Sequence, residues 1–356
     1  MNTQGTICVL VAFFLCFLFL SKGVLAGPLE PFGEVPFPPG NPHSLEKADL
    51  GKKLFFDRRL SGDGSMSCSS CHNPAKAFTD GQDISFSYPA TKNWRNAPTL
   101  LNAVFYQSLF HDGRAETLEE QALFPIRSPF EMNRNFDFME EVLRSVPEYV
   151  DAFRNVFGGE ITRERVAMAL ASFERTLFSR NVPLHRFLKG EKEALSAEAL
   201  KGLGIFEGKG SCIRCHNGSI LSDNGFHALE VPENPKYRDE PGVAATRRLF
   251  AREYGYGEYR TLKEDPGRFL ITQQKQDWKA FRTPTLLEIA KTAPYMHNGV
   301  FKTLDEVIDF IDRGGGMGNR ELHPLGLSKE EKGYLKAFLV EALSGDEIIV
   351  QKPEIP

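Results

Sequence analysis

The sequence has no excess of charge of either sign and little of the alternation that marks β-strands. Its 356 residues include 43 Lys and Arg against 47 Asp and Glu, a formal net charge of -4. A chain without a positive field is not expected to bind nucleic acid. Because strand-like alternation is scarce and several segments repeat apolar residues at helical intervals, we predict a mainly α fold. The length suffices for about two domains.

Long apolar runs are also absent, apart from one near the N-terminus. Ile7–Leu20 contains no polar residue, but it is short for a membrane span. The segment Val24–Ala26 ends in a small residue, as a signal-peptidase site requires. We therefore predict that residues 1–26 are a cleaved secretory signal and that the protein is periplasmic. Residues 1–6 contain no Lys or Arg, which leaves an uncleaved membrane anchor as the alternative.

Cysteine is scarce, and its placement is informative. Two of the six cysteines fall inside the predicted signal, and the other four form two pentapeptides, Cys68-Ser-Ser-Cys71-His72 and Cys212-Ile-Arg-Cys215-His216. The pattern C-x-x-C-H is the attachment signal of c-type haem, in which both thiols bind the porphyrin and the histidine binds the iron. A disulfide at this spacing would be strained, and zinc would need further ligands at finger-like spacing. We therefore predict two covalently bound haem c groups.

Helical periodicity and capping residues predict the following helices: 47–56, 136–157 with a break near Pro147, 163–177, a helix that starts at Ser196, and 328–343. Proline and glycine punctuate three other stretches, 27–43, 73–98 and 230–275. We predict that these three stretches are irregular.

A second internal repeat accompanies the two haem motifs. The segments Pro98–Leu101, His111–Gly113 and Thr117–Glu120 recur as Pro284–Leu287, His297–Gly299 and Thr303–Glu306, with a constant offset of 186 residues. Agreement over so many positions indicates two related halves, each with one haem. A charged stretch at 189–192 separates them. We predict an N-terminal domain at 27–190 and a C-terminal domain at 191–356, both of the cytochrome c type.

These motifs together resemble the di-haem cytochrome c peroxidases and the MauG-type enzymes. The resemblance rests on the following segments: Leu50–Asp57, Arg95–Thr99, Asp112–Ala115, Gln121, Phe130–Met132, Phe281–Pro284 and Thr292–Gly299. It covers nearly the whole chain after residue 26. It implies a periplasmic protein whose first domain holds a peroxide-reacting haem. The second domain would hold an electron-transfer haem, with a calcium ion between the two.

The resemblance also implies roles for individual residues. His72 and His216 match the proximal iron ligands of the two haems. Glu131 matches the distal acid and base, and Gln121 matches its hydrogen-bonding companion. A carboxylate beside an open haem suits peroxide chemistry, because cleavage of the O–O bond needs proton removal and delivery at one place. From the residues alone, a solvated surface acid is the favoured interpretation of Glu131, and only the resemblance reverses that preference.

The calcium site would use the Asn96 side chain and backbone oxygens of Thr292 and Pro294, again by resemblance. Oxygen donors fit a hard cation. These three residues would not suggest calcium without the resemblance.

The chain departs from the family's pattern at three positions. Tyr88 stands where the family's peroxidases have a histidine that blocks the first iron, so we expect an open first haem, as in the MauG type. His111 replaces the tryptophan that relays electrons between the haems. Ile311 replaces the methionine or tyrosine that binds the second iron, and it cannot bind iron itself. Either the second iron is five-coordinate or another side chain binds it, and Met317, in the glycine-rich run 314–318, is our candidate.

Five other residues have ordinary interpretations. His185, His227 and His323 are expected to be surface or packing histidines. Trp94 and Trp278 are expected at the edge of a core, with electron entrance at the surface as the alternative.

Three functions are compatible with the sequence. The first is an exported enzyme that reduces hydrogen peroxide with electrons from a small cytochrome or copper protein. The second is a MauG-like enzyme that oxidises side chains of a partner protein. The third is a non-enzymatic di-haem electron carrier. Dimers occur among the family's peroxidases, so a homodimer is a further expectation.

Overall fold

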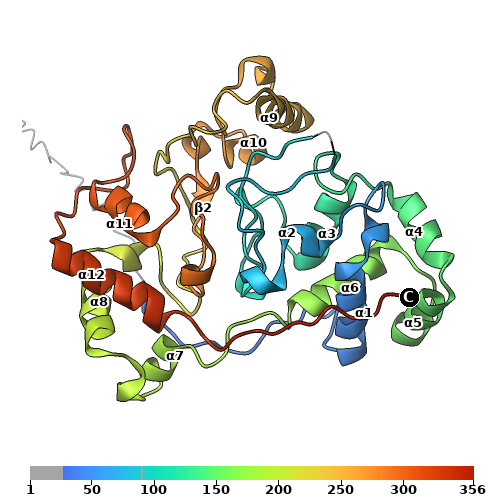
Figure 1. Cartoon of the computed structure of the whole chain (residues 1–356), viewed down its shortest axis with the longest axis horizontal. Coiled ribbons are helices and arrows are strands. Elements are labelled where there is room, and N and C mark those ends of the chain that lie inside the picture. Colours follow the sequence, from blue (N-terminus) through green and yellow to red (C-terminus); the bar gives the residue numbers. More distant parts are fainter. Residues whose placement is uncertain (1–26, 90) are drawn as a thin grey trace, which may run out of the picture.

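The computed structural model describes residues 27–89 and 91–356, and the predicted signal lies outside these residues. The fold is mainly helical, as predicted, and its two strands form one short antiparallel pair, β1 (Phe226–His227) with β2 (Phe281–Arg282). Figure 1 shows α1–α6 gathered at one end of the molecule and α7, α8, α11 and α12 at the other. Among the described residues, none of the helices has both the length and the apolar character that a membrane crossing requires.

Helices α1 (Leu45–Phe56) and α6 (Arg163–Glu174) form the centre of the first half. They cross at Gly51, where a Cβ atom would overlap the carbonyl oxygen of Ala169. Glycine therefore permits the close approach. The helices around this pair are α2 (Cys68–Cys71), α3 (Leu118–Arg127), α4 (Phe136–Arg144) and α5 (Pro147–Phe157). The break between α4 and α5 confirms the prediction at Pro147.

The second half repeats this arrangement with α8 (Ala197–Glu207) and α12 (Lys329–Ala337). A Cβ atom on Gly202 would overlap the carbonyl oxygen of Tyr334, so α8 and α12 also cross at a glycine. The last helix continues as a π-helix over Phe338–Ala342, close to its predicted end. The remaining helices here are α7 (Pro183–Leu188) and α11 (Leu304–Asp312).

A third group of elements lies above the two halves and was not predicted. Residues 230–275 contain α9 (Pro241–Glu253) and α10 (Phe269–Thr272), so the prediction of a long irregular region is wrong. Pro241 occupies the first turn of α9, where a missing N–H costs nothing, and the Glu240 side chain caps that turn. Helix α9 buries Val243 and Phe250 in a separate core around Trp94. Figure 1 shows α9 and α10 over the gap between the two ends.

Both termini run along the two halves. The lead-in 27–43 contains no helix, as predicted, and Leu29 pairs with Gly218 of the second half. The C-terminal tail leaves α12 and crosses to the first half, where the chain ends near α1 and α5 (Figure 1). There Ile348, Val350 and Ile355 pack against the core of the first half.

Candidate active site

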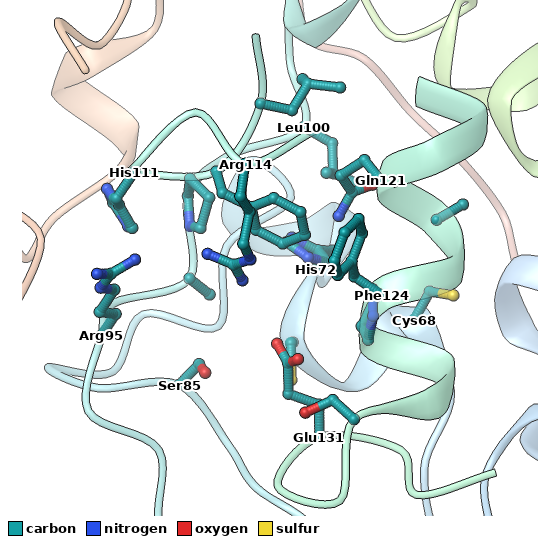
Figure 2. Close-up of a pocket in the computed structure, with 18 of the residues that line it drawn as sticks. Cys68, His72, Ser85, Arg95, Leu100, His111, Arg114, Gln121, Phe124 and Glu131 are labelled. Atoms are coloured by element: carbon teal, nitrogen blue, oxygen red, sulfur yellow. The ribbon is translucent and has the colours of Figure 1, made fainter. Parts of the chain in front are cut away.

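A cavity of about 730 Å³ lies mainly in the first half. Five of the residues predicted for haem binding and catalysis line it together, Cys68, Cys71, His72, Gln121 and Glu131, as does Asn96 of the predicted calcium site. Its walls come from the turn at 66–72, the loop 93–100, α3 and α6. Phe250 and Glu253 of α9, with Tyr254 directly after it, also line the cavity. The side chains of Gln121, Arg114 and Glu131 converge on the space beside His72 (Figure 2).

The imidazole of His72 has the orientation and the tautomer that an iron ligand requires. Its Nδ1 lies 3.1 Å from the carbonyl oxygen of Phe78. A carbonyl only accepts hydrogen bonds, so Nδ1 carries the proton and Nε2 presents its lone pair. Burial lowers the pKa of His72, which keeps the imidazole neutral. The one-turn helix α2 places Cys68 and Cys71 beside it, and burial raises the pKa of Cys68 to about 12.

The donor set and the enclosure fit a covalently attached haem. The cavity offers two thiols, one imidazole with a free Nε2, and mostly apolar walls. Two buried polar atoms that line it, Nε of Arg114 and Oε2 of Glu174, have no hydrogen-bond partner within the protein. Unpaired buried polar atoms are rare in a finished core, so they indicate that this cavity encloses another group.

Glu131 lines the cavity from a tight turn after α3. The turn is closed by hydrogen bonds from the N–H of Glu131 to the carbonyl of Ser128 (3.1 Å) and from Met132 to Pro125 (3.0 Å). Desolvation raises the pKa of Glu131, while the positive charge of Arg114 opposes the rise. Glu131 therefore faces the cavity rather than bulk water (Figure 2).

Helix α3 positions Gln121. The Thr117 side chain caps its first turn by accepting from the N–H of Glu120 at 3.1 Å. Glu119 forms two hydrogen bonds with Arg175, the residue that caps the end of α6, at 2.7 and 3.0 Å. This bidentate pair fixes α3 against α6, so the Gln121 amide has a defined direction.

The wall between the two halves contains His111 and a buried ion-pair network. Arg95 bonds to Asp112 at 2.5 Å and to Asp265 at 2.6 Å. His111 donates from Nε2 to the carbonyl of Asn96 at 2.9 Å. Burial and the charge of Arg95 lower the pKa of His111 to about 4, so it is a neutral residue at physiological pH. The Asn96 N–H in turn donates to the carbonyl of His297 at 2.6 Å, which joins the halves.

His216 in the second motif has the same geometry as His72. Its Nδ1 donates to the carbonyl of Leu221 at 2.9 Å, and burial lowers its pKa. Burial also raises the pKa of Cys212 to about 12. Both motifs therefore present a neutral imidazole with a free Nε2.

The distal side of the second motif differs from the expectation. The side chain of Met317 is fully exposed, so the structure does not place it in a pocket as an iron ligand. The glycine-rich run is fixed by a hydrogen bond from the N–H of Gly316 to the carbonyl of Leu229 at 2.9 Å. Ile311 is half-buried on α11.

His227 is more than a packing residue. It donates to Asp223 at 2.9 Å and also bonds to Glu321. These carboxylates raise its pKa to about 11, so it is charged. Cys215, Asp223 and His227 lie close enough for a metal site, but the haem motif already uses Cys215. His185 is a buried packing histidine, as expected, and bonds to the carbonyl of Ser219 at 2.9 Å.

The calcium site stays a prediction. The Asn96 amide donates to the carbonyl of Gln82 at 2.6 Å, and the Thr292 hydroxyl donates to the carbonyl of Ile289 at 3.2 Å. The peptide bond before Pro294 is cis. Tyr88 does not line the cavity, whose lining histidines are His72 and His111.

The sequence is similar to known proteins along most of its length. The family model described as di-haem cytochrome c peroxidase matches residues 45–193. A cytochrome-c peroxidase, IdrP1 of Pseudomonas sp. (strain SCT), is 46% identical, with 92% of this chain and 89% of the relative covered. The cytochrome c551 peroxidase of Nitrosomonas europaea is 34% identical, with 95% and 91% covered. The methylamine utilization protein MauG of Methylorubrum extorquens is 35% identical, with 90% and 85% covered.

Solved structures share the fold. A MauG-like protein associated with microbial copper homeostasis superimposes with a TM-score of 0.75 at 28% identity, covering 88% of this chain and 94% of that one. The di-haem peroxidase BthA of Burkholderia thailandensis gives 0.67 at 23% identity, covering 91% and 95%, which shows a common fold.

Proposed function

The chain belongs to the di-haem cytochrome c peroxidase family of oxidoreductases, and we propose that it is an exported enzyme that reduces hydrogen peroxide with electrons from a small redox protein. One observation carries the proposal. His72, Gln121 and Glu131 come from separate segments and line the same enclosed cavity. A carrier of electrons alone would not need a carboxylate and an amide there.

We assign one haem to each half, 27–190 and 191–356. The cysteines of each motif would attach the porphyrin, and Nε2 of His72 and of His216 would hold the irons. When bound, the haems supply irons that exchange single electrons, and the first also supplies the place where peroxide binds. The hydrogen bonds from Nδ1 to Phe78 and to Leu221 keep both imidazoles in the ligating tautomer.

Glu131 would move the proton. Reduction of peroxide, H2O2 + 2 H+ + 2 e- → 2 H2O, requires that one oxygen lose a proton and the other leave as water. The carboxyl of Glu131, whose pKa is raised by burial, is suited to take up that proton and return it. Gln121 is fixed by α3 and would orient the peroxide with its amide.

The electrons would arrive through the second half. We infer that a small cytochrome or copper protein docks near the second motif and that electrons cross the wall that holds His111. Export is supported by the predicted signal over 1–26 and by the chemistry of c-type haem, which is attached outside the bacterial cytoplasm.

A second candidate function is oxidation of a partner protein, as in the MauG type. The cavity lining favours it, because no histidine stands ready to block the first iron at the position of Tyr88. The histidine at position 111, where the family has tryptophan, counts against oxidation of a partner protein, because an imidazole is far harder to oxidise than an indole. Peroxide reduction needs fewer special residues, so we place it first.

Glu131→Gln tests the proposal. We expect peroxide turnover with a reduced donor protein to fall by about 10²–10⁴-fold, because the side chain can no longer take up a proton. Glu253→Gln is the matched control, since Glu253 is an exposed acid that also lines the cavity. Unchanged turnover in Glu131→Gln would contradict the assignment. No turnover in the unaltered protein, with both haems still redox-active, would leave the electron carrier.

A further inference from the structure

The oxidisable side chains of this protein are gathered in one place. The chain has two tryptophans and nine tyrosines. Both tryptophans and four of the tyrosines belong to the core around α9: Trp94, Trp278, Tyr237, Tyr254, Tyr256 and Tyr259. The proposed peroxide chemistry uses none of them. We call this group the aromatic cluster.

The aromatic cluster forms part of the cavity wall. Trp94, Phe250 and Tyr254 all line the cavity that holds His72. The ring of Tyr254 lies 4.7 Å from that of Phe250, centroid to centroid, and Phe250 lies 4.7 Å from Trp94. Tyr254 is half-buried and Trp94 is buried. These tilted contacts form a row of three rings along the cavity wall, and Tyr254 is its most exposed member.

A second set of ring contacts lies in the same core, around Phe269. The ring of Trp278 lies 5.2 Å from Phe269, and Phe269 lies 5.6 Å from Tyr256. Tyr256 and Trp278 are half-buried. These three rings do not line the cavity, and each lies close to the next in a T-shaped contact.

Charges near the rings distinguish Trp94 from Tyr254. The indole N–H of Trp94 donates to Asp265 at 3.0 Å, and the guanidinium of Arg95 lies 5.3 Å from the indole ring. The ion pair with Arg95 holds the pKa of Asp265 well below its usual range, so Asp265 is a poor proton acceptor. An oxidised Trp94 would keep its proton. Tyr254 can instead lose its phenolic proton to water, which makes it the more stable place for a missing electron.

We propose that the aromatic cluster is a second, one-electron oxidation site, with Tyr254 as its outlet for small phenolic reductants. The proposal rests on the proposed function, because peroxide in the cavity is the oxidant. For each peroxide, H2O2 + 2 ArOH → 2 H2O + 2 ArO•, where ArOH is a tyrosine hydroxyl. The O–O bond breaks, each tyrosine gives up one electron and one proton, and both protons end in the two product waters. A phenol at the surface then restores the tyrosine by giving up one hydrogen atom.

Electron paramagnetic resonance on the full holoprotein tests the proposal. The protein is mixed with hydrogen peroxide without any donor protein and frozen rapidly. We expect an organic radical signal in the unaltered protein and a loss of most of that signal in Tyr254→Phe. Tyr334→Phe is the matched control, because Tyr334 lies on α12, outside the cavity lining and the aromatic cluster.

Steady-state oxidation of guaiacol, a small phenol, supplies a second readout. We expect its rate to fall by about tenfold in Tyr254→Phe and to be unchanged in Tyr334→Phe. An unchanged radical signal together with an unchanged guaiacol rate would overturn the inference. Peroxide turnover with the donor but no radical in the unaltered protein would also overturn it, and would leave the proposed function standing. Absence of all peroxide turnover would reject both.

Discussion

The two motif histidines are held by the same hydrogen bond, although their surroundings differ. Nδ1 of His72 donates to Phe78 at 3.1 Å, and Nδ1 of His216 donates to Leu221 at 2.9 Å. Such bonds fix the ring and make Nε2 a stronger donor to a metal. The pentapeptides alone predict the ligands, but the carbonyl partners become visible only in the folded chain.

Glu174 gives a prediction at the scale of one residue. It is buried in the cavity wall, Oε2 has no partner, and burial raises its pKa to about 8. A carboxyl with a raised pKa holds its proton in the folded state after the unfolded chain has lost it, so stability falls as pH rises from about 4.5 to about 8. Glu174→Gln replaces the titrating carboxyl with a neutral amide, so this fall in stability with rising pH is absent from the variant.

We expect the melting temperature of Glu174→Gln, relative to the unaltered holoprotein, to rise steadily between about pH 5 and about pH 9. The gain at the alkaline end should be on the order of a few kcal/mol. Thermal unfolding at several pH values measures it. The exposed Glu253→Gln should show no such trend. A constant difference across the pH range would show that Glu174 finds a partner when haem is bound.

Single residues also show the limit of sequence reading. The motifs identify Glu131 and Gln121, and the structure brings both into one cavity with His72. Arg114, Glu174 and Tyr254 line the same cavity, yet nothing in the sequence singles out the last two. Their importance comes from burial and from neighbours distant in the chain, which no local pattern records.

At the scale of elements, the close helix crossings give a prediction with an internal control. A Cβ atom on Gly202 would overlap the backbone of α12, whereas Gly204 of the same helix faces open space. Gly202→Ala should destabilise the second half by about 1–3 kcal/mol, because overpacking forces α8 and α12 apart. Gly204→Ala should stabilise it by about 0.5–1 kcal/mol through helix propensity.

Denaturant unfolding of the two variants measures these effects. Small and equal changes in the free energy of unfolding of both variants would contradict the close approach of α8 and α12 at Gly202. The helices themselves were largely predictable, because caps such as Ser44, Thr162 and Ser328 precede clear apolar stripes. Helix α9 was missed because two of its five buried positions are polar, Thr246 and Arg247, and its first turn carries Pro241 and Gly242.

For the whole molecule, the cores follow the two sequence halves closely. One core contains buried residues from 50 to 177, and another contains Leu29 and residues from 182 to 343. The third core, around α9, joins Trp94 to residues 243–270 and so belongs to neither half alone. A repeat in the sequence cannot predict such a core, because it arises where unrepeated segments meet.

The C-terminal tail gives a prediction at this scale. Ile348 packs against the core of the first half, although its own chain segment follows the last helix of the second half. Ile348→Ala should lower the stability of the first half, whereas Ile349→Ala, at a position that is 75% exposed, should have little effect. A loss of about 1–3 kcal/mol is expected from the partial burial of the side chain.

Calorimetry of the holoproteins would show which transition moves. A shift of the transition assigned to the second half alone would contradict the tail's role in joining the halves. Equal changes in stability in Ile348→Ala and Ile349→Ala would also contradict that role of the tail.

The most direct test of the central claim is an optical titration of the fully oxidised holoprotein with stoichiometric hydrogen peroxide. If the first haem lies open in a cavity with Glu131, one equivalent of peroxide should bleach the Soret band at once, without prior reduction. Glu131→Gln should respond far more slowly. A protein that shows no change in the oxidised state, and none after one electron has been added, would contradict peroxide reduction in this cavity.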